Sequence, residues 1–201
     1  ADDYSFLIWG LLELYETTYK PDYLREAVNL NNEMLRLFWD HEKGGVYLYG
    51  NDGEQLITRP KEGYDGATPS ANSAAANNFI RLARLTGAHD LEDKAVQIIN
   101  YFSSAIGSYA AGFSHMLCSV LMLEAGGNEV IVCGDMDEGA DELINVLRQG
   151  FRPFTITMHQ HSKAAELGRL APFIADYNTV GGRAAAYVCK NYACQRPVTE
   201  A

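Results

Sequence analysis

The sequence TYKPDYLREAV at residues 18–28 decides the fold, because a related sequence, TGAHDLEDKAV, follows at residues 86–96. Thr, Asp, Ala and Val keep the same places in both copies, at a constant offset of 68 residues, as Thr18 and Thr86 show. Each copy joins two stretches with helical spacing of apolar residues. The chain therefore contains a repeated helical hairpin.

The two helices of each hairpin differ in polarity. We expect helices at 3–18 and 72–86 that are apolar on all sides and therefore buried, and helices at 22–39 and 91–102 that are apolar on one side and therefore outer. A fifth apolar pattern, at 113–124, begins a third hairpin that has no outer helix. Repeated helical pairs bury their faces by stacking on neighbours, so two and a half hairpins indicate part of an α/α toroid over residues 1–126.

The segment between the two hairpins carries a β-hairpin pattern. Val46–Tyr49 and Gln55–Thr58 flank Gly50–Gly53, a turn sequence rich in residues that tolerate positive φ. We expect this β-hairpin at the mouth of the toroid.

The period changes after Gly126 and Gly127. Residues 129–133 form a short apolar strand, 137–148 a helix, 154–158 a second strand and 184–188 a third. This order predicts a small C-terminal α/β segment, 127–201, with a mainly parallel sheet.

Composition excludes several classes of function. The net charge of −10 disfavours nucleic acid as a partner, and no apolar run approaches the roughly 20 residues needed to cross a bilayer. Four cysteines in 201 residues are too few for a secreted disulfide framework. We expect a soluble, cytoplasmic protein, and the start at Ala1 without Met indicates a processed product or a fragment.

Polar residues gather where the buried helices begin. Successive antiparallel helices place the N-termini of the first, third and fifth helices at one end, which we take as the mouth. Paired carboxylates there would suit sugar chemistry, and a histidine could act as a base for epimerisation. The catalytic candidates are Asp2, Asp3, Glu62, Asp65 and His115. The candidates for substrate binding are Tyr4, Arg59, Lys61, Tyr64, Ser70 and Asn72.

Structural interpretations of the same residues remain open. Asp2, Asp3 and Ser70 are also good N-cap residues, and His115 could be a hydrogen-bonded wall residue. The loop 59–73 has more charge, aromatic residues and glycine than an ordinary connection needs, which favours a functional pocket.

The C-terminal cysteines, Cys189 and Cys194, lie five positions apart after a predicted strand. A redox thiol pair, a packing role and an anion-binding role are all compatible with this spacing. Zinc bound with His159 and His161 is less compatible, because the spacing exceeds the usual two to four residues, and exposed loop positions are the simpler interpretation of the histidines. Asp135 follows Gly134 as in a nucleotide-binding turn, but no phosphate-binding motif follows. We predict no metal and no cofactor.

Several motifs in this order resemble one family. They are RPKE at 59–62, DGATPSANS at 65–73, FSH at 113–115 and YVCKNYACQRPVT at 187–199. Together they resemble the C-terminal third of the thioredoxin-domain proteins related to spermatogenesis-associated protein 20, over essentially the whole chain. Ala71 stands where this family is expected to have Gly.

The resemblance implies a longer protein, with an N-terminal thioredoxin-like domain and a six-hairpin toroid similar to N-acylglucosamine 2-epimerase and six-hairpin glycosidases. It supplies no established reaction. The leading hypothesis is a carbohydrate-active or sugar-binding toroid, acting as epimerase, isomerase or hydrolase on a small sugar. The alternatives are a non-catalytic scaffold or redox-regulatory partner of the attached thioredoxin-like domain, and a structural interaction module. With the other hairpins absent, we expect exposed flanks on the inner helices.

Overall fold

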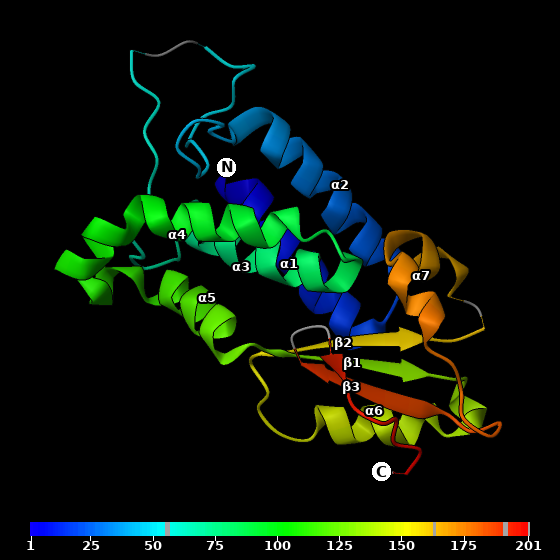
Figure 1. The fold of residues 1–201 in the computed structure, drawn as a ribbon. Coiled ribbons are helices and arrows are strands. Elements are labelled where there is room, and N and C mark those ends of the chain that lie inside the picture. Colours follow the sequence, from blue (N-terminus) through cyan, green and yellow to red (C-terminus); the bar gives the residue numbers. More distant parts are fainter. Residues whose placement is uncertain (55–56, 163, 191–192, 201) are drawn as a thin grey trace.

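The computed structural model describes residues 1–54, 57–162, 164–190 and 193–200, and it is mainly helical with a small sheet (Figure 1). Five helices form the first part of the chain. They are α1 (Asp2–Thr18), α2 (Pro21–Phe38), α3 (Ala71–Thr86), α4 (Asp90–Ser108) and α5 (Ser114–Ala125). A short 3-10 helix, η1 (Ala110–Phe113), joins the last two. The predicted helices are confirmed, and their ends shift by one or two residues except at α4, which continues to Ser108 where the sequence predicted an end at 102.

Helix α3 is the centre of the helical layer. It packs against α1, α4 and α5, while α2 packs on α1. Its small residues, such as Ala74, Ala75 and Ala76, are fully buried and let neighbouring helices approach closely. The helices α2 and α4 bury one side only, as an apolar period of three to four residues predicts. The inner and outer roles therefore alternate as expected, and the closed toroid stays a prediction.

Helix α1 departs from the expectation that it is buried on all sides. Leu7 is 54% exposed and Leu14 is 45% exposed, and a Cβ added at Gly10 between them would meet no atom of a neighbouring element within 4 Å. On the opposite side Ile8, Leu12 and Tyr15 are fully buried. Leu121 of α5 is likewise 55% exposed. The inner helices at the two ends of the row thus have uncovered apolar flanks.

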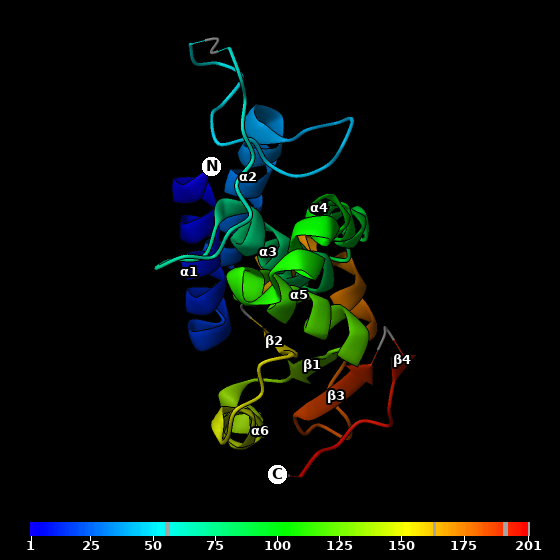
Figure 2. The same ribbon diagram turned by 90° about the vertical axis from the view of Figure 1, so that its left-hand side faces the viewer.

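The predicted β-hairpin is not formed by the described residues of its segment. Val46 makes a single bridge with Trp39, and the backbone N–H of Leu48 donates to the carbonyl of Pro60. The remaining described residues of 47–58 are turns and irregular backbone, and 55 and 56 lie outside the described residues. The described parts of this segment project from the helices in Figures 1 and 2. A hairpin does not form among them because Tyr47 and Leu48 donate their backbone N–H groups to Phe38, at the end of α2, and Pro60, in the stretch before α3.

The sheet has the order β2-β1-β3-β4 and is mixed. β1 (Asn128–Cys133) pairs parallel with β2 (Thr155–Gln160) and antiparallel with β3 (Ala185–Lys190), which pairs antiparallel with β4 (Ala193–Cys194). The expectation of a mainly parallel sheet is wrong, because among the described strands only β1 and β2 pair parallel, while β3 runs antiparallel to both β1 and β4. The connections contain η2 (Met136–Glu138), α6 (Ala140–Arg148), α7 (Ala165–Leu170) and η3 (Pro172–Asp176).

The two faces of the sheet bury different residues. Ile131, Ile156 and Met158 share one core with the helices, whereas Val130 and Val132 pack under α6 on the other face. This alternation is the two-residue period of a strand. Figure 2 shows the resulting order of layers, with the helices above the sheet and α6 below it. One continuous core therefore crosses the predicted boundary between residues 126 and 127.

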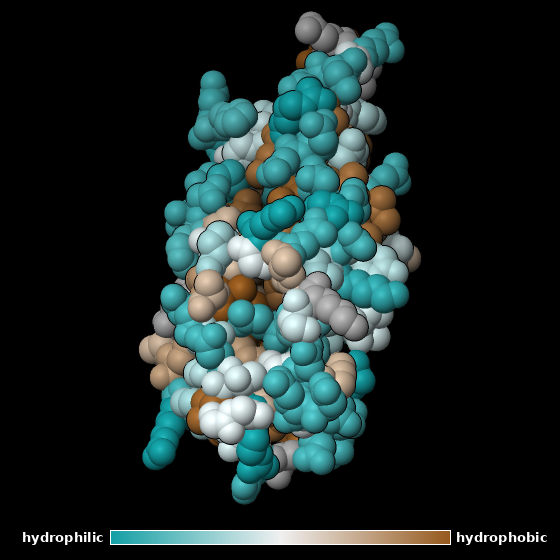
Figure 3. All heavy atoms as spheres, turned by 90° about the vertical axis from the view of Figure 1, so that its right-hand side faces the viewer, coloured by the Kyte–Doolittle hydropathy of each residue, from teal (hydrophilic) through white to brown (hydrophobic). Residues whose placement is uncertain are grey.

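The surface on the side of α2 and α7 is largely hydrophilic (Figure 3). Within the described ranges, no helix is long and apolar enough to span a membrane.

Candidate functional site

The N-termini of α1, α3 and α5 lie at the same end of the molecule, away from the sheet. At the opposite end, the backbone N–H of Thr157 in β2 donates to Glu16 of α1, and Arg84 of α3 pairs with Glu129 of β1. The chain leaves α5 directly into β1. The three helices therefore begin at one end of the molecule, as the sequence predicts.

Asp65 lies next to His115, as the sequence predicts. One oxygen of its buried carboxylate accepts the backbone N–H groups of His115 at 2.8 Å and Met116 at 3.3 Å. The other oxygen accepts the N–H of Ser70 at 2.9 Å. A carboxylate here is favourable because the first N–H groups of a helix carry partial positive charge. Asp65 therefore anchors the start of α5 with one oxygen and the residue before α3 with the other.

Ser70 and Asn72 fasten the loop before α3. The Ser70 hydroxyl accepts the N–H of Ser73 at 3.1 Å, which confirms Ser70 as an N-cap. The Asn72 amide accepts the N–H of Val46 at 2.8 Å and donates to the carbonyls of Val46 and Glu62. These two side chains, predicted to bind substrate, position the backbone of the loop.

Lys61 makes a buried ion pair that the sequence did not reveal. Its ammonium lies 2.6 Å from the carboxylate of Asp40 and 3.9 Å from the ring centre of Tyr101. Burial opposes the charge on Asp40, but hydrogen bonds from Lys61 and Tyr47 outweigh it and hold the pKa of Asp40 well below its usual range. Arg59 stacks over the Tyr47 ring at 4.1 Å. The charged groups of Lys61 and Arg59, both predicted to bind substrate, thus contact other side chains of the protein.

The remaining mouth candidates are mostly exposed. Asp2 and Asp3 lie in the first turn of α1, where Ala1 is the N-cap, so neither acid caps the helix. Glu62 is exposed, and Tyr64 is 60% exposed. Tyr4 packs against Phe38 with ring centres 5.5 Å apart.

An aromatic pair joins α1 and α5 across α3. The Trp9 indole stacks on the His115 imidazole with ring centres 4.7 Å apart and planes 27° apart. Burial lowers the pKa of His115, although the Asp65 carboxylate opposes this, so the imidazole is neutral at pH 7. Its Nε2 atom is buried and has no hydrogen-bond partner in the described structure. His115 is thus a wall of the site, with one polar atom unused.

A charged cluster lies next to the aromatic pair. The Trp9 indole N–H donates to Glu13 at 3.0 Å, and Arg81 of α3 donates to Glu13 at 2.7 Å and also to Glu16. Arg81 is 7% exposed, whereas the Glu13 side chain is 59% exposed. Burial raises the pKa of Glu16, and Arg81 opposes that effect. We call Trp9, Glu13, Arg81 and His115 the inner-helix cluster.

Sequence reasoning missed Trp9, Glu13 and Arg81. The signal was Arg81 itself, one of two arginines in a helix that was expected to be buried, because a buried guanidinium requires acidic partners nearby.

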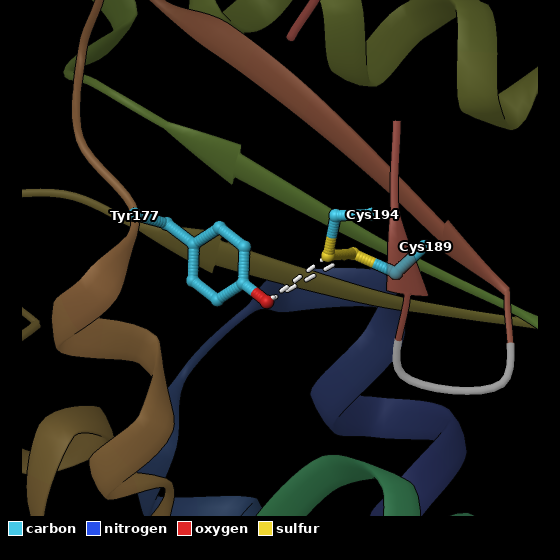
Figure 4. The surroundings of a disulfide bond; sticks show 3 residues. All are labelled: Tyr177, Cys189 and Cys194. Atoms are coloured by element: carbon cyan, nitrogen blue, oxygen red, sulfur yellow. Dashed lines mark hydrogen bonds between the residues drawn. A yellow bond between two sulfur atoms is a disulfide. The ribbon is translucent and has the colours of Figure 1, made fainter. Parts of the chain in front are cut away.

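Cys189 and Cys194 form a disulfide, with the Tyr177 hydroxyl 3.1 Å from the sulfur of Cys194 and 3.9 Å from that of Cys189 (Figure 4). The two residues face each other in register across β3 and β4. The bond removes them as zinc ligands, and the described residues contain no group of three metal-ligating side chains. Of the interpretations left open by the sequence, a disulfide is compatible with both the redox pair and the packing role.

His159 is not an exposed loop residue. It lies in β2, it is 3% exposed, and its ring Nε2 lies 2.9 Å from the carbonyl of Gly134. His161 follows the strand with its ring centre 4.8 Å from that of His159.

A cavity of about 500 Å³ lies between the end of α3 and the sheet. Its lining includes Arg84, Glu129, Phe173, Tyr177 and Cys189. The disulfide therefore forms part of a cavity wall.

Comparison with known proteins identifies relatives over nearly the whole chain. It is 31% identical to spermatogenesis-associated protein 20 from Homo sapiens over 202 residues, which cover 99% of this chain and 26% of the relative. The Rattus norvegicus protein gives the same identity and coverage. This chain is similar over nearly its whole length to one part of spermatogenesis-associated protein 20. An uncharacterised protein of Caenorhabditis elegans is 30% identical over 199 residues, covering 98% of this chain and 27% of the relative.

No protein-family model matches the chain. The chain spans about a quarter of the length of the curated relatives that it matches.

Proposed function

We propose that the chain binds a sugar on the face formed by α1, α3 and α5, as the C-terminal part of a longer carbohydrate-active protein. The observation that carries the proposal is the stack of Trp9 on His115, which sets an indole next to a carboxylate and a guanidinium. Aromatic rings stack on the apolar faces of sugars, while carboxylate and guanidinium groups bind their hydroxyls.

The charges of the inner-helix cluster leave one acid available. Arg81 is enclosed by α1 and neutralised by Glu13 and Glu16, so its role is to hold Glu13 in place. The Glu13 carboxylate is largely exposed and can accept hydroxyl hydrogen bonds. The neutral imidazole of His115 supports the indole from behind.

The reaction class stays within those that the sequence predicts: epimerase, isomerase or glycoside hydrolase. The Asp65 carboxylate is engaged with backbone donors, so we assign it to building the site. Asp2, Asp3 and Glu62 are the exposed acids that could supply proton transfer from the mouth.

The rest of the longer protein completes the site in this proposal. The uncovered flanks of α1 and α5, at Leu7, Leu14 and Leu121, pack on further helical hairpins of a closed toroid. An N-terminal thioredoxin-like domain precedes them, as the family resemblance implies.

Fluorescence of Trp9 tests the proposal. A panel of mono- and disaccharides, with N-acylated and uronic sugars included, is titrated into the longer protein. A binding sugar shifts the indole emission of the parent protein. Trp9→Ala lacks this reporter, so its affinity is measured by calorimetric titration and is expected to be about tenfold weaker, the loss of roughly 1.4 kcal/mol of stacking. Glu13→Gln is also expected to weaken the affinity for the sugar.

Phe151→Ala is the matched control, because Phe151 is 92% exposed and lies between α6 and β2. The Phe151→Ala variant is expected to bind the sugar with the same affinity as the parent protein. A sugar that binds with equal affinity to the Trp9→Ala and parent proteins would show that the inner-helix cluster is not the site.

A further inference from the structure

We propose that the Cys189–Cys194 disulfide is a thiol–disulfide exchange site that accepts two electrons from a dithiol, with attack at Cys194 and departure of Cys189. The exchange is independent of the sugar-binding proposal, because the disulfide lies on the sheet and shares no residue with the inner-helix cluster.

Exposure decides which sulfur is attacked. Cys194 belongs to the edge strand β4 and is exposed, whereas Cys189 is 2% exposed in β3. An incoming thiolate must approach a sulfur in line with the bond that it breaks. Only Cys194 offers that approach from solvent, so Cys189 becomes the leaving group.

Tyr177 is placed to assist that departure. Its hydroxyl is within hydrogen-bonding range of both sulfurs, and its ring packs edge-on against Tyr187 with ring centres 5.0 Å apart. Burial raises the pKa of Tyr177, so the phenol keeps its proton near neutral pH and remains a donor. A donor is needed because a thiolate at Cys189 forms in a buried place, directly opposite Glu129 in the register of β1 and β3.

The exchange balances in two steps. A thiolate of the dithiol bonds to Sγ of Cys194, the disulfide breaks, and its electron pair goes to Sγ of Cys189, which accepts the Tyr177 hydrogen bond and then a proton from solvent. The second thiol of the dithiol loses its proton, attacks the dithiol sulfur of the mixed disulfide and releases Cys194 as a thiolate, which then takes up a proton from solvent. The chain ends with two thiols, and the dithiol ends as a disulfide.

The cavity next to the disulfide gives the exchange a structural effect. Cys189 and Tyr177 both line it, so reduction replaces a fixed sulfur bridge in its wall with a thiol. Reduction also removes the covalent tie between β4 and β3, whose pairing covers two residue pairs in the described part of the chain.

The other two cysteines serve as internal references. Cys118 is exposed, and burial raises the pKa of Cys133 to about 12. Alkylation of the untreated protein followed by mass spectrometry is therefore expected to label Cys118 and to find Cys189 linked to Cys194. Purified protein in which Cys189 and Cys194 are both free thiols before any reductant is added overturns the proposal.

The rate of reduction tests the role of Tyr177. Tyr177→Phe is expected to slow reduction by dithiothreitol about three- to tenfold, the effect of one hydrogen bond, without lowering the melting temperature of the oxidised protein. Tyr109→Phe, at an exposed tyrosine remote from the sheet, leaves the rate unchanged. Equal rates for Tyr177→Phe and the parent protein overturn the assignment of Tyr177.

Single cysteine variants test the direction of attack. In a Cys118→Ser background, the thiol that Cys189→Ser leaves at Cys194 is expected to react with an aromatic disulfide reagent at least about tenfold faster than the thiol that Cys194→Ser leaves at Cys189, because buried thiols react slowly. Equal or inverted rates overturn the direction.

The source of the dithiol is resolved by comparing dithiothreitol with reduced thioredoxin at equal dithiol concentration. Faster reduction by thioredoxin identifies a protein dithiol as the donor, and faster reduction by dithiothreitol identifies a small molecule. Failure of both to reduce the bond in the folded protein overturns the exchange.

Discussion

The carboxylate of Asp65 accepts the backbone N–H of His115 at 2.8 Å, so a loop that precedes α3 holds the start of α5, fifty positions later in the chain. This contact gives the polar residues of that loop a structural role. It also makes the first prediction.

Asp65→Ala is expected to destabilise the protein by about 2 kcal/mol, because three buried N–H groups lose their acceptor. Urea unfolding followed by circular dichroism measures the change. Glu62→Gln is the control, since Glu62 is exposed in the same loop, and its effect should stay within about 0.5 kcal/mol. Equal effects of the two substitutions would contradict the anchoring role of Asp65.

Lys61→Met is expected to cost about 3 to 5 kcal/mol, because it leaves the buried Asp40 carboxylate without its cation. The double variant Lys61→Met with Asp40→Leu should regain most of this loss, since no buried charge remains. Chemical denaturation of the single and double variants provides the comparison. If the double variant is the least stable of the set, the pair is not the dominant interaction.

Gly127→Ala is expected to destabilise the protein by about 2 kcal/mol through overpacking. A Cβ there would lie 2.1 Å from a guanidinium nitrogen of Arg84 and 2.6 Å from the carbonyl oxygen of Phe154. Gly10→Ala is the matched control, since Gly10 lies inside α1 with open space around it, and it should stabilise by up to about 1 kcal/mol. Thermal unfolding of both variants should therefore give shifts of opposite sign.

The cost of His159→Asn should be smaller at pH 5.5 than at pH 7.5. Burial lowers the pKa of His159 in the folded protein, although the hydrogen bond to Gly134 opposes this. The folded state thus binds fewer protons than the unfolded state, and the stability that neutral His159 contributes is lost as the pH falls below the unfolded value of about 6.5. Asparagine does not titrate, so its variant escapes that loss. Unfolding free energies of both proteins at the two pH values check the difference, and a cost that grows on acidification would contradict the sign.

The helices could be predicted from the sequence because their period and their repeated link are local features. The pattern around Thr18 and Thr86 predicts where α1 and α3 end and where α2 and α4 begin, to within about four residues. A β-hairpin at Val46 was predicted wrongly, because the backbone partners of this segment, Trp39 and Pro60, depend on how α2 and the stretch before α3 pack. The antiparallel addition of β3 is likewise a tertiary outcome.

The candidate site was predicted only in part. The approach of Asp65 to His115 follows from the direction of the helices, so the sequence predicts it. The stack of Trp9 on His115 does not follow, since it depends on the rotation of α1 about its own axis. The disulfide was one of several open interpretations, because strand register decides whether Cys189 and Cys194 face each other.

The shared core has a practical meaning for dissecting this molecule. Ile131, Met158 and Ile174 fill the same apolar interior as Leu12 and Phe79, on the other side of residue 126. A truncation at that point would expose to water the ends of three helices that face the sheet, and it would expose the face of the sheet that packs on the helices. Calorimetry should accordingly record a single endotherm for the whole chain, and neither half should survive expression by itself.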